Sequence, residues 1–325
     1  MPAANATNRY NQFDRQLDAL QDSLALRAKS LIVTVLGDVV EAHGGGLWLG
    51  NLIALVAPFG INERLVRTSV LRLSREGWLG ARQIGRRSYY ELTPDGRQRI
   101  RDSARRIYAG PRTVWDGRWH LVLTGLGEIG EGPRARLRRE LRWLGFGALG
   151  PNIFAHPQAD LEALRNLLEA LALRDEVVVM RGGTEALAGI SPSHELLGKA
   201  FDLRDISAAY SDFLDRFMLF CSLSSGPEIE PASAFRLRIL MSHEFRRVRL
   251  RDPALPAELL PKNWIGGRAW TLARELYEAL LEASDAHLRA VAETDTGALP
   301  EPQAGYYDRF GGVGPRANVQ ASGAE

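Results

Sequence analysis

The chain has 325 residues, of which 45% are hydrophobic and 25% are charged, so its composition is that of a globular protein and excludes a wholly disordered one. The single cysteine, Cys221, excludes an internal disulfide framework and suits a reducing compartment. The first 20 residues are polar and do not form a signal peptide. The longest apolar stretch, residues 47–61, contains Asn51 and Pro58 and is shorter than the roughly 20 residues of a membrane helix. We therefore expect a soluble cytoplasmic protein with about two or three domains and no membrane partner.

Positive charge is concentrated in one part of the chain. Between Ile61 and Arg118 there are fourteen arginines and six acidic residues, an excess of eight positive charges, whereas the whole chain carries a net charge of +2. The remainder is therefore acidic, with a net charge of −6. The chain has only three lysines, so a general preference for arginine explains the residue type. It does not explain the clustering, which indicates a polyanionic partner for this segment.

The N-terminal third predicts three helices and a hairpin. Residues 1–25 are polar, and we expect a flexible tail. Apolar residues at helical spacing predict a helix over residues 29–42, and residues 48–56 predict a second, short helix. Asn62 is a suitable N-cap for a third helix over residues 63–76, which Gly77 ends.

Two short strands over residues 78–84 and 87–92 flank Gly85 and Arg86, a pattern typical of a hairpin. Thr93 and Pro94 then begin another helix, as N-cap and first helical residue. Short helices that lead into a hairpin predict a winged helix-turn-helix domain over residues 26–112.

The rest of the chain predicts a multidomain α+β fold. Strands over residues 119–124, 146–149, 152–155 and 176–180 alternate with helices over 133–144 and 161–173 in the order β-α-β-β-α-β. This order predicts a ferredoxin-like domain over residues 113–183, with a dimerisation or linker role. Helices over residues 206–222, 231–250 and 267–291 predict a helical C-terminal domain, residues 184–292, for effector binding or assembly. Residues 293–325 are rich in Gly, Pro and Ala, and we expect a second flexible tail.

The third predicted helix has the two faces of a recognition helix. At about 100° per residue, one face carries Val66, Ser69, Val70 and Leu73, which would dock it on the preceding helices. Arginine can bind the O6 and N7 atoms of guanine with two hydrogen bonds. The alternative is that the arginines on the face opposite this apolar stripe only solvate an amphipathic helix. The predicted DNA-binding residues are Arg64, Arg67, Thr68, Leu71 and Arg75 on the opposite face of the helix, with Arg82, Arg86 and Arg87 on the hairpin.

Several ordered motifs resemble the PaaX family of repressors. They run through most of the chain, from residue 27 to about residue 290, and are more specific than a helix-turn-helix pattern alone. In the N-terminal third they are Ser30–Thr34, Leu47–Gly50, Pro58–Thr68, Arg72-Leu73, Glu76–Leu79, Gly85–Tyr90 and Leu92-Thr93. Further along they are Trp115–Gly117 with Trp119, His243–Arg247, Asp252-Pro253, Leu255-Pro256 and Leu259–Pro261.

The resemblance implies a repressor of a phenylacetic acid catabolic operon that binds double-stranded operator DNA and is released by phenylacetyl-coenzyme A. It also implies a winged N-terminal domain, a central domain similar to small CRISPR-associated ferredoxin-like nucleases, and a helical C-terminal domain. We expect a homodimer on a palindromic site. The alternatives are a regulator of another acyl-coenzyme A-linked pathway and a nucleic-acid-processing enzyme built on the ferredoxin-like domain.

No enzyme site is predicted, and no cofactor or metal is expected. The run Gly125–Gly130 fits a dinucleotide-binding pattern, but Glu128 lies where a pyrophosphate needs backbone N–H groups, and no acidic residue ends the next strand. A nuclease would need an acidic residue at the end of the first ferredoxin-like strand, where Thr124 stands instead. The six histidines show no metal-ligand spacing.

Arginines that crowd one stretch of the C-terminal half suggest an effector site. Guanidinium groups bind phosphate, and tryptophans could line an aryl pocket. The alternative is that these arginines form ion pairs between packed helices. The predicted effector-binding residues are Arg246, Arg247, Arg249, Arg251, Trp264 and Trp270.

Overall fold

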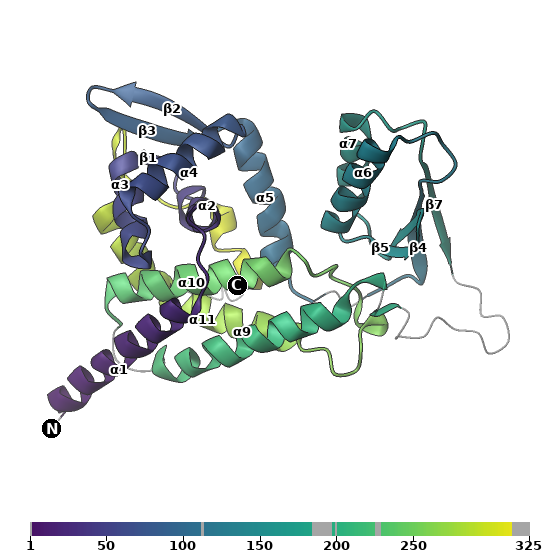
Figure 1. Ribbon diagram of the computed structural model, residues 1–325. Coiled ribbons are helices and arrows are strands. Elements are labelled where there is room, and N and C mark those ends of the chain that lie inside the picture. Colours follow the sequence, from purple (N-terminus) through teal and green to yellow (C-terminus); the bar gives the residue numbers. More distant parts are fainter. Residues whose placement is uncertain (1, 112–113, 184–196, 199, 225–228, 314–325) are drawn as a thin grey trace, which may run out of the picture. The chain divides into compact units, whose positions relative to one another are not determined.

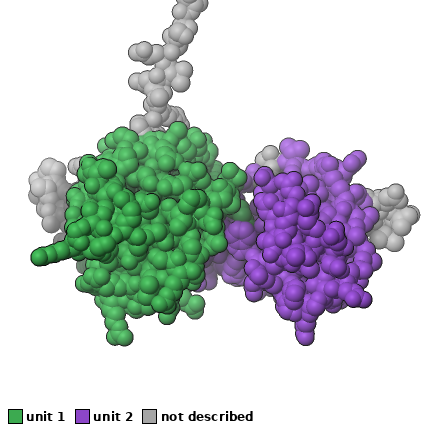
Figure 2. Space-filling model, turned by 90° about the horizontal axis from the view of Figure 1, so that it is seen from above, with its two compact units in different colours: residues 1–109, 213–246, 270–325 green, residues 110–212, 247–269 purple. Residues whose placement is uncertain are grey.

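The computed structural model describes residues 2–111, 114–183, 197–198, 200–224 and 229–313, with side chains from residue 12 onward (Figure 1). The chain forms two compact units, coloured separately in Figure 2, and each unit is assembled from distant stretches of sequence. Unit 1 contains residues 1–109, 213–246 and 270–325, and unit 2 contains residues 110–212 and 247–269. Among the described residues, no helix combines the length and the apolar character needed to cross a bilayer.

Residues 28–108 of unit 1 contain four α-helices, two short helices of other types and a three-stranded antiparallel sheet. The sheet order is β1-β3-β2, and β2 and β3 form the predicted hairpin. The predicted helices and both hairpin strands are confirmed to within two residues at each end, whereas β1 was not predicted. The elements are α2 (Ala28–Val35), the π-helix η1 (Leu36–Val40), β1 (Gly46–Trp48), α3 (Leu49–Val56), the 3-10 helix η2 (Ala57–Phe59), α4 (Glu63–Arg75), β2 (Leu79–Ile84), β3 (Arg87–Leu92) and α5 (Pro94–Tyr108).

Local capping fixes where these elements begin and turn. The Asn62 side chain accepts a hydrogen bond from the Leu65 backbone N–H at 3.0 Å, and the Thr93 hydroxyl accepts one from Gly96 at 2.9 Å. Each cap satisfies a donor that the first helical turn leaves unpaired. Gly85 has a φ of +60°, a conformation that the tight hairpin turn requires and that side chains disfavour.

The N-terminal segment is a helix, so the prediction of a flexible tail over residues 1–25 is wrong for its described part. Helix α1 spans Pro2–Ser23, and Phe13, Leu17 and Leu20 are buried. Their spacing of four and three residues places them on one helical stripe, which packs within unit 1. On the polar side, the Asp18 carboxylate lies 2.7 Å from Arg236.

The C-terminal segment is also folded, so the prediction of a flexible tail is wrong for residues 293–313. Tyr306, Phe310 and Val313 are buried, because aromatic residues within the Gly-rich run supply apolar surface for the core of unit 1. Residues 314–325 lie outside the described residues. The elements are β8 (Glu293–Thr294), β9 (Gly297–Ala298) and the 3-10 helices η4 (Ala304–Tyr306) and η5 (Arg309–Gly311).

A buried ionic network ties three distant segments of unit 1 together. Arg238 is fully buried and lies 2.9 Å from the Asp38 carboxylate and 2.7 Å from that of Asp285. Arg309 is also buried and donates a hydrogen bond to the Tyr277 hydroxyl at 2.6 Å. Two guanidinium groups and two carboxylates balance in charge, and each is hydrogen-bonded, which buried charges require.

Three long helices each contribute residues to both units. They agree with the predicted C-terminal helices to within three residues. The predicted division, with residues 184–292 as one domain, differs from the compact units, which divide this range between them. Residues 184–196 lie outside the described part of that range. The helices are α9 (Leu203–Ser224), α10 (Pro231–Arg249) and α11 (Gly266–Val291), and a short 3-10 helix, η3 (Ala257–Leu259), lies between the last two.

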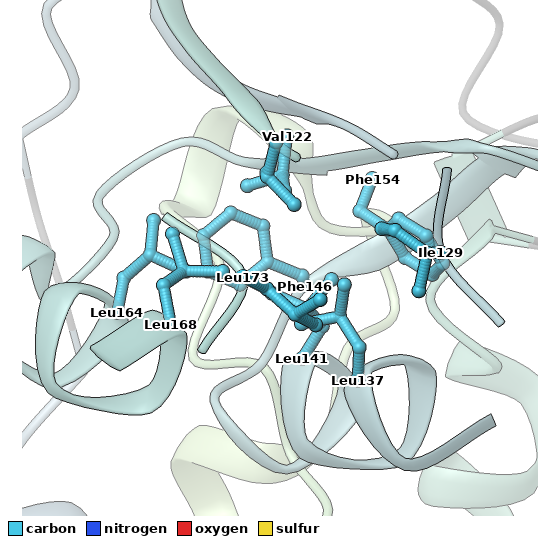
Figure 3. Close-up of a cluster of buried hydrophobic side chains, with 10 residues drawn as sticks. Val122, Ile129, Leu137, Leu141, Phe146, Phe154, Leu164, Leu168 and Leu173 are labelled. Carbon is cyan, nitrogen blue, oxygen red and sulfur yellow. The ribbon is translucent and has the colours of Figure 1, made fainter. Parts of the chain in front are cut away.

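Unit 2 contains a four-stranded antiparallel sheet in the order β5-β6-β4-β7, and the predicted β-α-β-β-α-β sequence of elements is confirmed. Figure 3 shows the core on one face of the sheet, where Val122 and Phe154 meet Leu137 and Leu141 of α6 and Leu164 of α7. A second cluster, which includes Trp119 and Phe201, also packs in this unit. The elements are β4 (Arg118–Leu123), α6 (Glu131–Trp143), β5 (Gly147–Gly150), β6 (Ile153–His156), α7 (Leu161–Ala170) and β7 (Val178–Gly183).

Candidate nucleic-acid interface

Helix α4 is docked by its apolar face, as its periodicity predicts. Val66 and Leu73 are fully buried, and Ser69 and Val70 are buried beside them. This stripe contacts α2 and α3, so α4 rests on the two preceding helices. The opposite face is consequently free of the core of unit 1.

The five DNA-binding residues predicted for the third helix all lie on the exposed face of α4. Arg64, Arg67, Thr68, Leu71 and Arg75 are exposed, and half of the Leu71 surface is accessible to solvent. Arg67 forms an exposed i,i+4 ion pair with Glu63 at 2.6 Å. Arg64 and Arg75 have no ion-pair partner in the described part of the chain. Their guanidinium groups therefore remain available to an external anion.

The hairpin presents a second group of arginines. Residues 81–87 are exposed throughout, and they include Arg82, Arg86 and Arg87. Arg86 lies in the turn and makes no ion pair with any described residue. Tyr89 is buried and packs edge-on against Trp48, so it is a core residue. Unit 1 thus displays guanidinium groups on both α4 and the β2–β3 hairpin.

Two hairpin arginines have acidic partners that the sequence pattern did not predict. Arg82 lies 2.7 Å from Asp295, and this hydrogen bond is the main reason that the pKa of Arg82 is raised. Arg87 lies 2.8 Å from Glu293, and its guanidinium carbon lies 4.0 Å from the centre of a Trp48 ring. Both acidic residues were assigned to a flexible tail, and only the acidic character of the segment could have drawn attention to them.

The predicted effector-binding residues do not gather within either unit. Arg246 and Trp270 belong to unit 1, and the other four belong to unit 2. Arg246 donates to the Ser30 hydroxyl at 3.1 Å. The Trp270 indole N–H donates to the Tyr108 carbonyl at 3.3 Å. Both are thus engaged in packing contacts within unit 1.

The effector residues in unit 2 differ in accessibility. Arg249 is buried in an ion pair with Asp252 at 3.2 Å, as in the alternative of helix packing. Arg247 and Arg251 are exposed. Trp264 lines a groove of about 800 Å³ in unit 2. Of the two predicted aryl-binding residues, Trp264 borders this groove, whereas Trp270 is engaged in the packing contact described above.

The loop after β4 has structural contacts at the positions considered for nucleotide or metal binding. A Cβ atom at Gly127 would overlap Glu176, so glycine permits close packing there. Thr124 is buried at the end of β4, and its backbone N–H donates to the Asn152 carbonyl at 3.0 Å. Within the described residues, no three His, Cys, Asp or Glu side chains are grouped as metal ligands.

Comparisons with known proteins match nearly the whole chain. Residues 27–96 match the family described as PaaX-like protein, residues 112–193 the PaaX protein central Cas2-like domain, and residues 201–290 the PaaX-like protein C-terminal domain. The chain is 33% identical over 305 residues to the transcriptional repressor PaaX of Escherichia coli, with 93% of this chain and 96% of that protein covered.

A solved structure is similar as well. It is an uncharacterized protein of Mycobacterium tuberculosis, 26% identical, with a TM-score of 0.53, and the match covers 81% of this chain and 99% of that one. The curated relative is a repressor and not an enzyme. With three family matches in order and a curated relative aligned over nine-tenths of its length, the chain belongs to the PaaX family.

Proposed function

We propose that this protein is a DNA-binding transcriptional repressor, that residues 26–112 form a winged helix-turn-helix, and that it acts in the cytoplasm. The observation that carries the proposal is the exposed arginine face of α4, whose other face is buried against α2 and α3. The name of the curated Escherichia coli relative supports repression as the outcome of DNA binding.

The two arginine groups would have different tasks on DNA. Arg64, Arg67 and Arg75 on α4 would enter the major groove, where a guanidinium can bind guanine with two hydrogen bonds. The exposed Leu71 and Thr68 would offer methyl groups to thymine. Arg86 at the hairpin turn would contact a phosphate or a narrow minor groove, which contributes affinity more than sequence preference.

We further propose that the protein binds as a homodimer and that unit 2 holds a ferredoxin-like domain with an assembly role. The strand order β5-β6-β4-β7 supports this domain type. The two strands that α6 connects, β4 and β5, have β6 between them, and the two that α7 connects, β6 and β7, have β4 between them. A dimer would place two α4 helices in half-sites about 34 Å apart, or a multiple of that distance. Light scattering should then give a mass near twice the 36.0 kDa of one chain.

The effector we propose is an aryl- or acyl-coenzyme A, with phenylacetyl-coenzyme A as the first choice. Release from DNA requires that the effector bind one arrangement of the dimer more tightly than the other. The groove beside Trp264 supports a site for the aryl end, because it is large enough for a ring and Trp264 offers an aromatic side chain. For the phosphate groups we keep the predicted Arg247 and Arg251, which are exposed in the same unit but do not line this groove.

The test is a mobility-shift assay with the DNA upstream of the protein's own gene and an unrelated duplex as control. We expect the upstream DNA to be retarded at lower protein concentration, and phenylacetyl-coenzyme A to reverse the shift. Release by another thioester only would retain the repressor and replace the effector. Equal retardation of both duplexes, or of neither, would contradict the proposed function.

A further inference from the structure

A short acidic turn of the C-terminal segment lies on the arginine-bearing hairpin. This turn, residues 293–296, consists of β8 and the two residues that lead into β9. Its position is fixed by two hydrogen bonds to the first half of unit 1. The Trp48 indole N–H donates to the Thr294 carbonyl at 3.0 Å, and the Glu293 backbone N–H donates to the Asn51 side-chain oxygen at 3.4 Å. The turn is therefore a docked part of unit 1.

The docked turn directs two carboxylates at two of the three hairpin arginines. Asp295 pairs with Arg82 at 2.7 Å, and Glu293 pairs with Arg87 at 2.8 Å. Arg82 also lies 3.2 Å from Glu91 of the hairpin itself, so Asp295 is the nearer of its two carboxylate partners. The ring of Trp48 lies under the Arg87 guanidinium and limits the directions in which it can turn. Two guanidinium groups that could contact DNA thus already have anionic partners, whereas Arg86 has none among the described residues.

Both ion pairs are accessible enough for a DNA phosphate to replace the carboxylate. The Arg82 and Arg87 side chains are 51% and 54% exposed, so water screens both ion pairs and each contributes little to stability. A DNA phosphate could therefore displace a carboxylate from either arginine. The displaced carboxylates would remain close to the DNA and repel it, which lowers the affinity for every duplex.

We infer that Glu293 and Asp295 compete with DNA phosphates for Arg87 and Arg82, so that the acidic turn weakens DNA binding by this chain. The inference rests on the proposed DNA-binding function. It assigns a regulatory role to a segment outside α4 and the hairpin. Any change that lifts residues 293–296 from the hairpin would increase its affinity for DNA.

The test compares the full-length protein with its Glu293→Gln/Asp295→Asn variant by fluorescence anisotropy on the upstream duplex. The amides keep the size of the side chains and remove both charges. We expect about threefold to tenfold tighter binding and a steeper salt dependence, because up to about two more phosphates would be neutralised. The matched control is Glu278→Gln/Glu282→Gln, which removes two exposed charges from α11 that pair with no described residue.

A second comparison separates competition from a merely structural role. In an Arg82→Gln/Arg87→Gln background, the same amide substitutions should give no gain beyond that of the control. Unchanged or weaker binding by Glu293→Gln/Asp295→Asn, or an equal gain in the control, would overturn the inference. If the parent protein binds no duplex, the proposed function fails. Arginine modification by phenylglyoxal tests separately whether the carboxylates shield these arginines from an external reagent, and shielding predicts faster reaction of Arg82 and Arg87 in the amide variant.

Discussion

At the scale of single residues, the arginines of unit 1 have two opposite environments. Arg64, Arg75 and Arg86 are exposed and have no ion-pair partner among the described residues. Arg238 and Arg309 are buried among carboxylates and tyrosine hydroxyls. The first group suits an external polyanion, and the second holds the unit together. Residue type alone does not distinguish them, but a charge inside an apolar run, as at Arg238, is a signal of burial.

The buried Arg238 should be essential for stability. An Arg238→Met substitution would leave Asp285 and Asp38 without their principal cation, and removal of one partner of a buried pair costs about 3–5 kcal/mol. Chemical denaturation measures this cost. The control is Arg236→Met, whose partner Asp18 is mostly exposed and whose loss should cost about 1 kcal/mol or less. Similar small losses in both variants would show that the network contributes little.

His43 should make the protein less stable in mild acid. It is fully buried, its Nδ1 lies 2.7 Å from the Val39 carbonyl, and burial lowers its pKa below the usual 6.5. The unfolded chain therefore takes up a proton that the folded one resists, and stability falls as the pH drops through the unfolded-state pKa. Denaturation at a series of pH values should show a shallower decline for His43→Gln than for the parent. An identical decline would assign the effect elsewhere, for example to His287, whose pKa is also lowered by burial.

At the scale of elements, local signals predicted α4 and the hairpin well. Asn62, Thr93 and Gly85 act within a few residues of themselves, so their effects can be read from neighbouring sequence. The short strand β1 depends on pairing with β3, some 40 residues away, and has no comparable local signal. The π-helix η1 contains Asp38, whose buried partner Arg238 lies 200 residues away, so its surroundings have no local signal either.

The cap of α4 should be measurable. An Asn62→Ala substitution removes the acceptor for the Leu65 N–H, and loss of such a cap costs about 1 kcal/mol. Thermal denaturation should detect this loss, and Asn62→Asp should restore most of it because aspartate also caps. DNA affinity should fall only modestly, since the arginine face is retained. No loss of stability in Asn62→Ala would mean that packing alone sets the start of α4.

At the scale of the whole molecule, the sequence predicted the types of element but not how distant segments combine. The C-terminal residues belong to the same compact unit as the N-terminal helices, and α9, α10 and α11 each contribute to both units. Such sharing arises from long-range burial, for which a Gly-rich, Pro-rich segment carries little periodic signal. Tyr306 and Phe310 were the available hints, because buried aromatic residues stabilise strongly.

Removal of the C-terminal segment should therefore destabilise the N-terminal half. A chain truncated after Ala292 loses Tyr306, Arg309 and Phe310, and with them part of the buried network and core. We expect a lower and broader thermal transition. A chain truncated after Val313 keeps these residues and is the matched control. Equal melting of the parent and both truncated chains would show that the segment is dispensable for folding.

If the exposed arginines of α4 read DNA, they set the ratio between the affinity for the upstream duplex and the affinity for an unrelated one. The parent protein should prefer the upstream duplex, whereas Arg64→Gln/Arg67→Gln/Arg75→Gln should bind both equally, since each guanine contact contributes about 1–3 kcal/mol of discrimination. Its thermal unfolding should match that of the parent, because the three side chains are exposed. Retention of the full preference by this folded variant would contradict the account.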